Sequence, residues 1–230
     1  MRIPNITALF QKQIKDVLKN MPVLVLFIVY PIIAAVMTNA MSDQPEVGTM
    51  FLSIFATMHC AFTPIVATSS IIAEEKEKNT LRVLIMSNVT LREYLFSIGG
   101  FVLIATLITG STFLLIQTQS LVKSLLFLAS MGIGGLISIA LGMCIGLLSK
   151  NAAAANGLAV PFGMVFAFLP MLANFNKGIE AVSRFTYGQQ VSYLFAGKPF
   201  TVFGVVILCI NFIALITVST LLYKRSIAED

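Results

Sequence analysis

The sequence has few charged residues, and this scarcity excludes several classes of protein. Only 11% of its 230 residues are charged, 57% are hydrophobic and none is Trp, whereas about a quarter of a soluble domain's residues are charged. It has one histidine and three widely spaced cysteines, so neither a disulfide framework nor a thiolate metal site is expected. It also lacks the G-x-x-x-x-G-K-[ST] loop that holds phosphates, so this chain is not expected to bind ATP by itself.

Six stretches of 23 to 29 residues contain no Asp, Glu, Lys or Arg. A helix needs about 20 residues to cross the roughly 30 Å hydrocarbon layer. The sequence therefore predicts an all-α polytopic membrane protein, a single transmembrane domain over residues 1–230. Its six spans are expected at about residues 21–40, 49–73, 94–117, 124–148, 157–172 and 202–223. Because the spans carry no cluster of acidic residues, His or Cys, proton relays, metal transport and catalysis in this chain are not expected.

Lys and Arg are distributed unevenly between the two sides that six spans would define. Counted from an inner N-terminus, 11 of the 15 Lys and Arg residues fall on the inner side. Because positive residues favour the cytosolic side, both termini are predicted to be cytosolic, in a multi-pass protein of a bacterial plasma membrane. The net charge of +5 follows from this distribution and from anionic inner lipid, so nucleic-acid binding is not expected.

Two further segments are predicted to lie along the membrane surface. Residues 5–19 place apolar side chains on one helical face and lysines on the other, which is typical of an interfacial amphipathic helix. Residues 174–201 mix aromatic and polar side chains, so interfacial or re-entrant helices are expected in the outer leaflet. In the fourth span, a stripe of small residues predicts the close approach of another helix. This stripe consists of Gly134, Ser138, Gly142 and Gly146.

The most charged part of the chain, residues 74–93, lies between the second and third spans. Asn79 can adopt the left-handed conformation that ends a helix, and Thr90 with Glu93 fits the capping box that begins the next one. One face of the short helix between them is formed by Leu81, Leu84 and Ile85. An apolar face of this kind can dock in a groove of a cytosolic partner, so this is the predicted coupling segment.

His59 is the only histidine and the only readily ionisable side chain near the middle of a span. The simplest interpretation is a neutral ring hydrogen-bonded to a neighbouring helix. A position lining a substrate pathway is the functional alternative, and metal or proton chemistry is a third. Cys60, Cys144 and Cys209 also fall inside spans, where they are expected to pack as small apolar residues.

The coupling segment resembles a signature of one transporter family. In type 2 ATP-binding-cassette (ABC) transporter permeases, the motif E-x-E-x-G-T-L follows the second span. The matching residues here are Glu75, Glu77, Asn79, Thr80, Leu81 and, further on, Leu84. Residues 185–188, Phe-Thr-Tyr-Gly, resemble the family's outer N-P-L-T-Y motif. Asn79 replaces the usual Gly, Asn88 a common Pro, and Ser183 with Arg184 the usual Asn-Pro pair.

The resemblance implies a membrane subunit of an ATP-driven exporter, with ATP bound by a separate ABC ATPase subunit and no cofactor in this chain. It also implies a second permease subunit, identical or different. ATPase coupling would fall to the matched residues and Ile85. The apolar spans suit a hydrophobic or amphipathic substrate, such as a peptide, drug, lipid or lipid-linked glycan. A non-transporting immunity or sensor protein and a secondary transporter are the alternatives.

Overall fold

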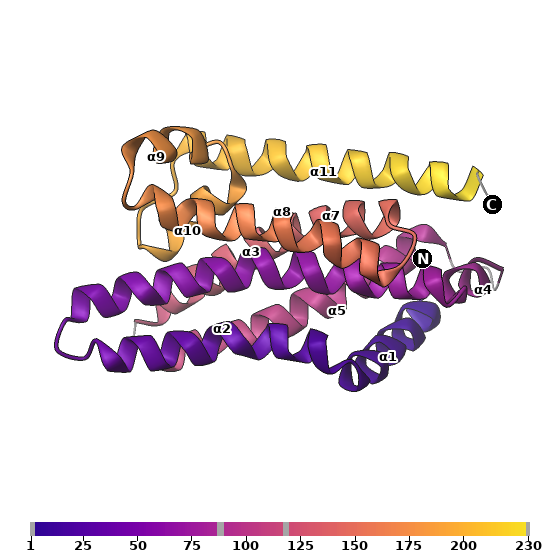
Figure 1. Ribbon diagram of the computed structural model, residues 1–230, viewed down its shortest axis with the longest axis horizontal. Helices are drawn as coiled ribbons and strands as arrows, with labels where there is room; N and C mark the ends of the chain where they lie inside the picture. The colour runs from indigo at the N-terminus through magenta and orange to yellow at the C-terminus, as the bar shows by residue number, and fades with distance from the viewer. Residues whose placement is uncertain (1–2, 87–89, 117–119, 229–230) are drawn as a thin grey trace.

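The computed structural model describes residues 3–86, 90–116 and 120–228, with side chains omitted at 3–6, 81–82, 85, 91–92 and 223–228. Every regular element in this part of the chain is an α-helix (Figure 1). The helices are α1 (Ile3–Lys19), α2 (Met21–Ala40), α3 (Pro45–Glu77), α4 (Thr80–Met86), α5 (Leu91–Ser111), α6 (Phe113–Ile116), α7 (Leu121–Leu148), α8 (Ala152–Ala173), α9 (Lys177–Ser183), α10 (Tyr187–Phe195) and α11 (Val202–Ala228).

Six helical segments are long and apolar enough to cross a membrane, which confirms the predicted number of spans. They are Met21–Ala40, Pro45–Glu77, Glu93–Ile116, Leu121–Leu148, Ala152–Ala173 and Val202–Leu222. The third consists of α5 and α6, and the predicted end of that span at Gln117 lies outside the described residues. The first span matches the prediction at both ends.

Helix α8 begins at Ala152, earlier than the expected start of the fifth span at residue 157. The Asn151 side chain accepts a hydrogen bond from the Ala154 amide at 2.8 Å and so caps the helix. Four alanines follow this cap, and alanine has the highest intrinsic helix propensity. The connection between α7 and α8 is therefore shorter than the sequence pattern indicated.

Two helices, α3 and α7, form the centre of the bundle. In their membrane-spanning stretches 83% and 78% of the residues are buried, whereas in the other spans the buried share is 17% to 39%. The predicted small-residue stripe of α7 packs against α3, which confirms its expected role. A Cβ added at Gly142 would lie 2.7 Å from the Ile65 carbonyl oxygen, and one at Gly146 would lie 2.9 Å from the Ile72 Cβ. Small residues thus let the two backbones approach closely.

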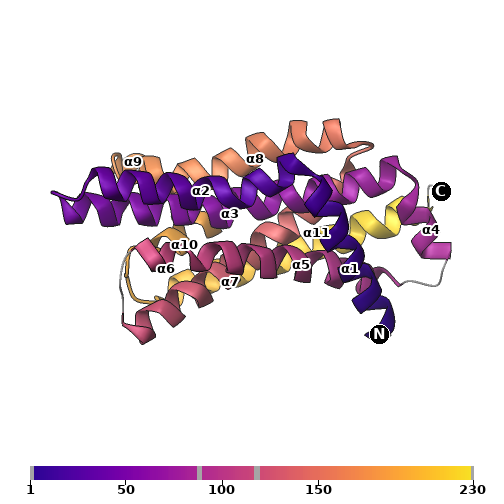
Figure 2. The same cartoon turned by 90° about the horizontal axis from the view of Figure 1, so that it is seen from below.

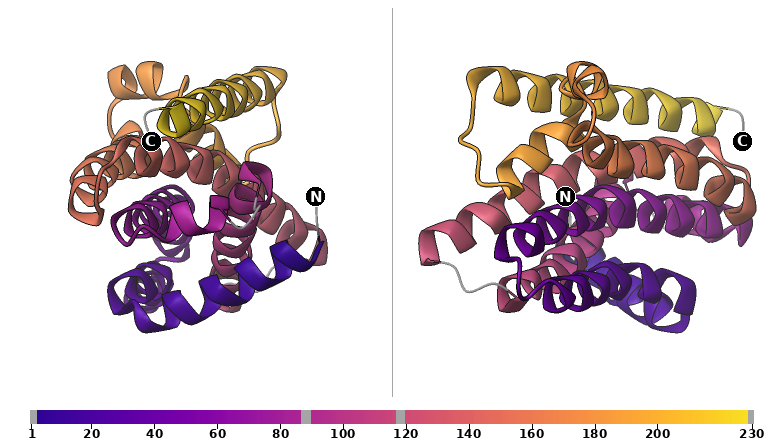
Figure 3. Two further views of the ribbon diagram at one scale, coloured as in Figure 1. Left: turned by 90° about the vertical axis from the view of Figure 1, so that its right-hand side faces the viewer. Right: turned by 60° about the vertical axis from the view of Figure 1, so that its left-hand side comes forward.

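The short helices gather at the two ends of this bundle. The helices α1 and α4 and the C-terminal end of α11 share one end, and α9 and α10 lie at the other (Figures 1 and 2). Viewed from that first end, α1 runs across the bundle instead of parallel to the spans (Figure 3). The segments that follow the second and fifth spans are therefore on opposite ends, as the predicted topology requires.

Helix α10 packs into the bundle between α3, α7 and α8. Tyr187 at its start is buried, and its hydroxyl lies 2.9 Å from the hydroxyl of Ser138 on α7. Gly188 lies directly against the backbone of Phe166 on α8, where a Cβ would collide with the carbonyl oxygen. The Tyr-Gly pair of the outer motif is thus a tight packing point between helices.

Candidate coupling site

The coupling segment turns sharply at Asn79. Helix α3 ends at Glu77, and α4 begins at Thr80. Asn79 has a φ of 54°, which among the described residues is the one positive value at a residue other than glycine. The prediction of a left-handed residue here is confirmed. Asparagine tolerates this conformation better than most residues, so it can stand where the family usually has Gly.

Substitutions at Asn79 should separate backbone conformation from side-chain chemistry. Asn79→Gly should retain or slightly raise thermal stability, because glycine adopts positive φ without steric cost. Asn79→Val should lose roughly 1–2 kcal/mol, since a β-branched residue is disfavoured there. Thermal melting of the purified variants measures the difference, and equal stability of the two would contradict this account.

Helix α5 begins with the predicted capping box, which is confirmed. The Thr90 side chain accepts a hydrogen bond from the Glu93 amide at 3.4 Å, and the Glu93 carboxylate accepts one from the Thr90 amide at 3.0 Å. Glu93 is also buried. The cap defines where the chain leaves the coupling segment, while residues 87–89, including Asn88, lie outside the described residues.

Four consecutive residues at the end of α3, Glu74 to Glu77, contact four different parts of the bundle. Glu74 accepts a hydrogen bond from the Asn20 side chain at 2.6 Å, at the junction of α1 and α2. Glu75 is only 6% exposed. It pairs with Lys12 and accepts a hydrogen bond from Gln13 at 2.9 Å, both on α1. The first two residues therefore attach α1 and α2 to α3.

The next two residues bind the facing ends of α7 and α8. Lys76 donates a hydrogen bond to the Leu147 carbonyl at 2.6 Å, at the C-terminus of α7. Glu77 accepts one from the Ala152 amide at 3.0 Å, at the N-terminus of α8. A cation at a helix C-terminus and an anion at an N-terminus are both favourable with the helix dipole. We call residues 74–77 the α3 hub.

The structure places the predicted coupling residues in different environments. Glu75 faces inward, Glu77 is exposed apart from its α8 contact, and Leu84 is half-buried against the core cluster that includes Tyr94 and Ile98. The side chains of Leu81 and Ile85 lie outside the described part. Among the described side chains of α4, the exposed apolar ones are Val83 and Met86, at 58% and 75%. Their spacing of three residues places them on one face of the helix, but the sequence does not show whether that face is exposed.

A cavity of about 590 Å³ opens beside the hub, between α1, α2, α3 and α4. Its lining includes Lys12, Glu74, Glu75, Lys78 and Thr80. One carboxylate oxygen of Glu75, Oε2, is buried and makes no hydrogen bond within the part of the chain described. Buried polar atoms without a partner are uncommon in folded proteins.

His59 lies far from this site and is fully buried between α3 and α5. Its Nε2 is 3.1 Å from the Thr109 hydroxyl and 3.3 Å from the Thr106 carbonyl, and its Nδ1 is 3.4 Å from the Thr63 hydroxyl. At about 1.5 Å per residue, some 24 Å of α3 separates it from Glu75. These contacts match the interhelical interpretation, and no function at His59 follows from them.

Comparison with known proteins identifies the family. Residues 3–224 match a family model described as ABC-2 family transporter protein. The chain therefore belongs to the ABC-2 family of transporter membrane proteins. It is a membrane permease domain of an ABC transporter and a multi-pass membrane protein, from a permease family that lacks an ATPase domain. No curated protein sequence matches it significantly.

Proposed function

We propose that this chain is the membrane-spanning subunit of an ATP-driven exporter, coupled through α4 to a separate ATPase subunit that binds ATP. The observation that carries the proposal is the combination of an exposed apolar pair on α4, Val83 and Met86, with the α3 hub behind it. An exposed pair of apolar side chains on one helix can dock in an apolar groove of a partner. The hub connects that contact to α1, α2, α7 and α8.

The proposed mechanism follows from these connections. When two ATPase subunits close on ATP, each would displace an α4 helix seated in its groove. Because α4 is joined to α3 through the short turn at Asn79, the displacement would reach the hub, and the hub would pass it to α1, α2, α7 and α8. A small movement at an interface can in this way change the arrangement of packed helices.

The proposed orientation places α1, α4 and both termini in the cytosol, and α9 and α10 in the outer leaflet. The excess of Lys and Arg on the α4 side and the even number of spans support it. In this orientation α1 is an interfacial helix, and its crossing of the bundle end is consistent with that position (Figure 3). A bacterial plasma membrane is the proposed location.

A second permease subunit and an apolar pathway complete the proposal. In the membrane-spanning stretches of α2, α8 and α11, only 17% to 22% of the residues are buried within one chain. Their apolar surfaces are thus available to lipid and to a second membrane subunit. A pathway between such surfaces suits a hydrophobic or amphipathic substrate, such as a peptide, drug, lipid or lipid-linked glycan.

The coupling proposal is tested by placing a charge on α4. Met86→Asp should reduce ATPase stimulation in proteoliposomes at least ten-fold and weaken co-purification of the ATPase, because a carboxylate would be buried in an apolar groove. Met86→Leu is the matched control and should retain both properties, since it keeps the apolar volume. Wild-type binding and stimulation in Met86→Asp would reject a coupling role for α4.

A further inference from the structure

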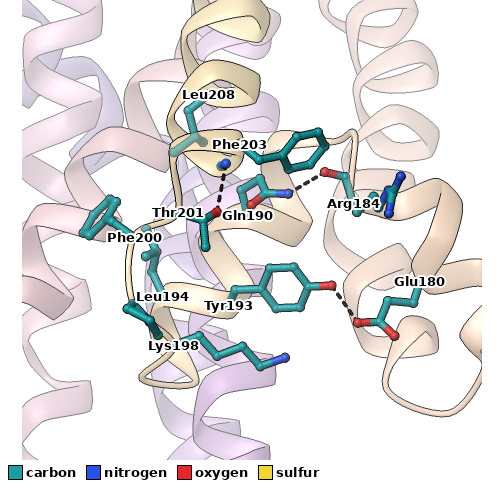
Figure 4. A pocket seen from close by; sticks show the side chains of 12 residues that line it. Glu180, Arg184, Gln190, Tyr193, Leu194, Lys198, Phe200, Thr201, Phe203 and Leu208 are labelled. Carbon is teal, nitrogen blue, oxygen red and sulfur yellow. Dashed lines mark hydrogen bonds between the residues drawn. The ribbon is translucent and has the colours of Figure 1, made fainter.

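A second cavity lies at the other end of the bundle, between α9, α10 and the first turns of α11 (Figure 4). It has a volume of about 440 Å³. Its floor is mostly apolar, and its lining includes two basic side chains, Arg184 and Lys198. The basic residues come from separate segments, one just after α9 and one between α10 and α11. The fold therefore brings two positive charges to one small cavity.

Both cations rest on aromatic rings and have no carboxylate partner within the described chain. The Arg184 guanidinium lies 4.9 Å from the ring centroid of Phe185 and 5.7 Å from that of Phe203. The Lys198 ammonium lies 4.2 Å from the ring centroid of Tyr193. A cation–π contact orients a cation without neutralising its charge. Arg184 and Lys198 thus keep their charge for an anionic ligand.

Among the described lining residues there is one carboxylate, Glu180, and it is hydrogen-bonded within the cavity. Tyr193 donates a hydrogen bond to Glu180 Oε1 at 2.7 Å, as Figure 4 shows. Burial, together with this bond and the charge of Glu180, raises the pKa of Tyr193 to about 12. The hydroxyl therefore stays protonated at neutral pH and continues to donate its hydrogen bond to the Glu180 carboxylate. Two cations against one occupied carboxylate leave the cavity positive.

The position of the cavity indicates what kind of anion would bind there. It is lined by the start of α11, where the sixth span begins at Val202. From Phe203 onward α11 exposes apolar side chains along the span. These include Val206, Ile210 and Ile213. A ligand with a negative headgroup and an acyl chain would match the cavity with the first part and this surface with the second.

We propose that the cavity between α9, α10 and α11 binds the phosphate headgroup of an anionic phospholipid, with Arg184 and Lys198 supplying the positive charge. The acyl chains lie along the exposed face of α11. The first turn of α11 adds the positive end of its helix dipole. The site requires α11 to span the membrane, and it does not depend on coupling to an ATPase or on which side of the membrane the cavity faces.

Fluorescence quenching tests the site, because the chain has no Trp of its own. Phe200→Trp places a single tryptophan in the cavity lining, and its fluorescence can be excited separately from that of the tyrosines. In vesicles, brominated phosphatidylglycerol should quench it more strongly than brominated phosphatidylcholine. Arg184→Gln and Lys198→Gln should each reduce this preference about five-fold, the ratio that corresponds to about 1 kcal/mol per basic residue near an anionic surface.

Matched variants make the result specific. Lys177→Gln removes a nearby charge outside the cavity and should leave the preference unchanged. Leu125→Trp, at an exposed position near the start of α7, should be quenched equally by the two lipids and reports on correct insertion. Equal quenching at Phe200→Trp, or a preference that survives Arg184→Gln with Lys198→Gln, would overturn the proposal. If inorganic phosphate changes the emission of Phe200→Trp while the two lipids quench it equally, free phosphate is the ligand and the lipid is rejected.

Discussion

Replacing Gly142 with alanine should lower the free energy of unfolding by about 1–3 kcal/mol, the usual cost of overpacking a filled interior. The new Cβ would lie 2.7 Å from the Ile65 carbonyl oxygen and 2.9 Å from the Thr68 Cβ. Backbone on the opposing helix cannot move aside as a flexible side chain can. The two central helices, α3 and α7, would therefore have to separate. A lower thermal melting midpoint in detergent should report this.

Gly132 in the same helix is the matched control, because a Cβ added there meets no atom within 4 Å. Gly132→Ala should be neutral or stabilising by about 0.5–1 kcal/mol, since alanine favours the helix over glycine. The two substitutions are chemically identical, yet only the one at Gly142 should destabilise the protein. Equal effects at Gly142 and Gly132 would mean that the close α3–α7 contact does not limit stability.

Reversing the charge of Glu75 should detach α1 from the α3 hub and abolish most ATPase stimulation. In Glu75→Lys, two ammonium groups would face each other, and Gln13 would lose its acceptor. Breaking a fully buried ion pair costs about 3–5 kcal/mol. The Lys12 side chain is 29% exposed, so solvent screening should reduce that cost. We expect at least a ten-fold loss of stimulation with expression retained.

Thiol labelling can show the detachment directly. Val17 on α1 is buried, so Val17→Cys should resist a polar maleimide reagent unless Glu75→Lys is also present. The exposed Cys209 should first be changed to serine to remove background labelling. Glu46→Lys, the same charge change in the first turn of α3 at the other end of that helix, should leave labelling and ATPase stimulation unaltered. Full stimulation in Glu75→Lys would exclude the hub as a transmission point.

Features that depend on neighbouring residues in the chain were predictable from the sequence. The lengths of the apolar runs predicted the spans, because the thickness of the bilayer sets the minimum number of apolar residues in a membrane-spanning helix. The left-handed Asn79 and the capping box at Thr90 and Glu93 are local devices with characteristic residue types. The small-residue stripe that includes Gly142 predicted close packing, because small side chains let two helix backbones approach each other.

Features that depend on distant residues were not predictable. Glu75 and Glu77 were predicted as ATPase-coupling residues, and the structure shows that their side chains also bind other parts of this same chain. Glu75 meets Lys12 across 63 positions of sequence, and Glu77 meets Ala152 across 75. The spacing of these residues in the sequence does not predict that they pair. Only the packing of α1 and α8 around the end of α3 brings them together.

The exposed face of α4 was missed for a related reason. A seven-residue helix has barely two turns, and apolar residues occur on more than one side of Thr80–Met86. The sequence pattern therefore could not decide which side faces the bundle. The turn at Asn79 sets that rotation, leaving Leu84 half-buried and Met86 exposed. Which residues can reach a partner is thus a result of backbone geometry.

The paired contacts of Lys76 and Glu77 also restrict how α3 can move. Adjacent residues of a helix point about 100° apart, so these two side chains hold α7 and α8 from different directions. A twist of α3 about its own axis would break both bonds at once, whereas a shared tilt of α3, α7 and α8 would preserve them. A displacement delivered at the α4 end of the bundle should therefore be least costly as a joint tilt of α3, α7 and α8 against the rest of the protein.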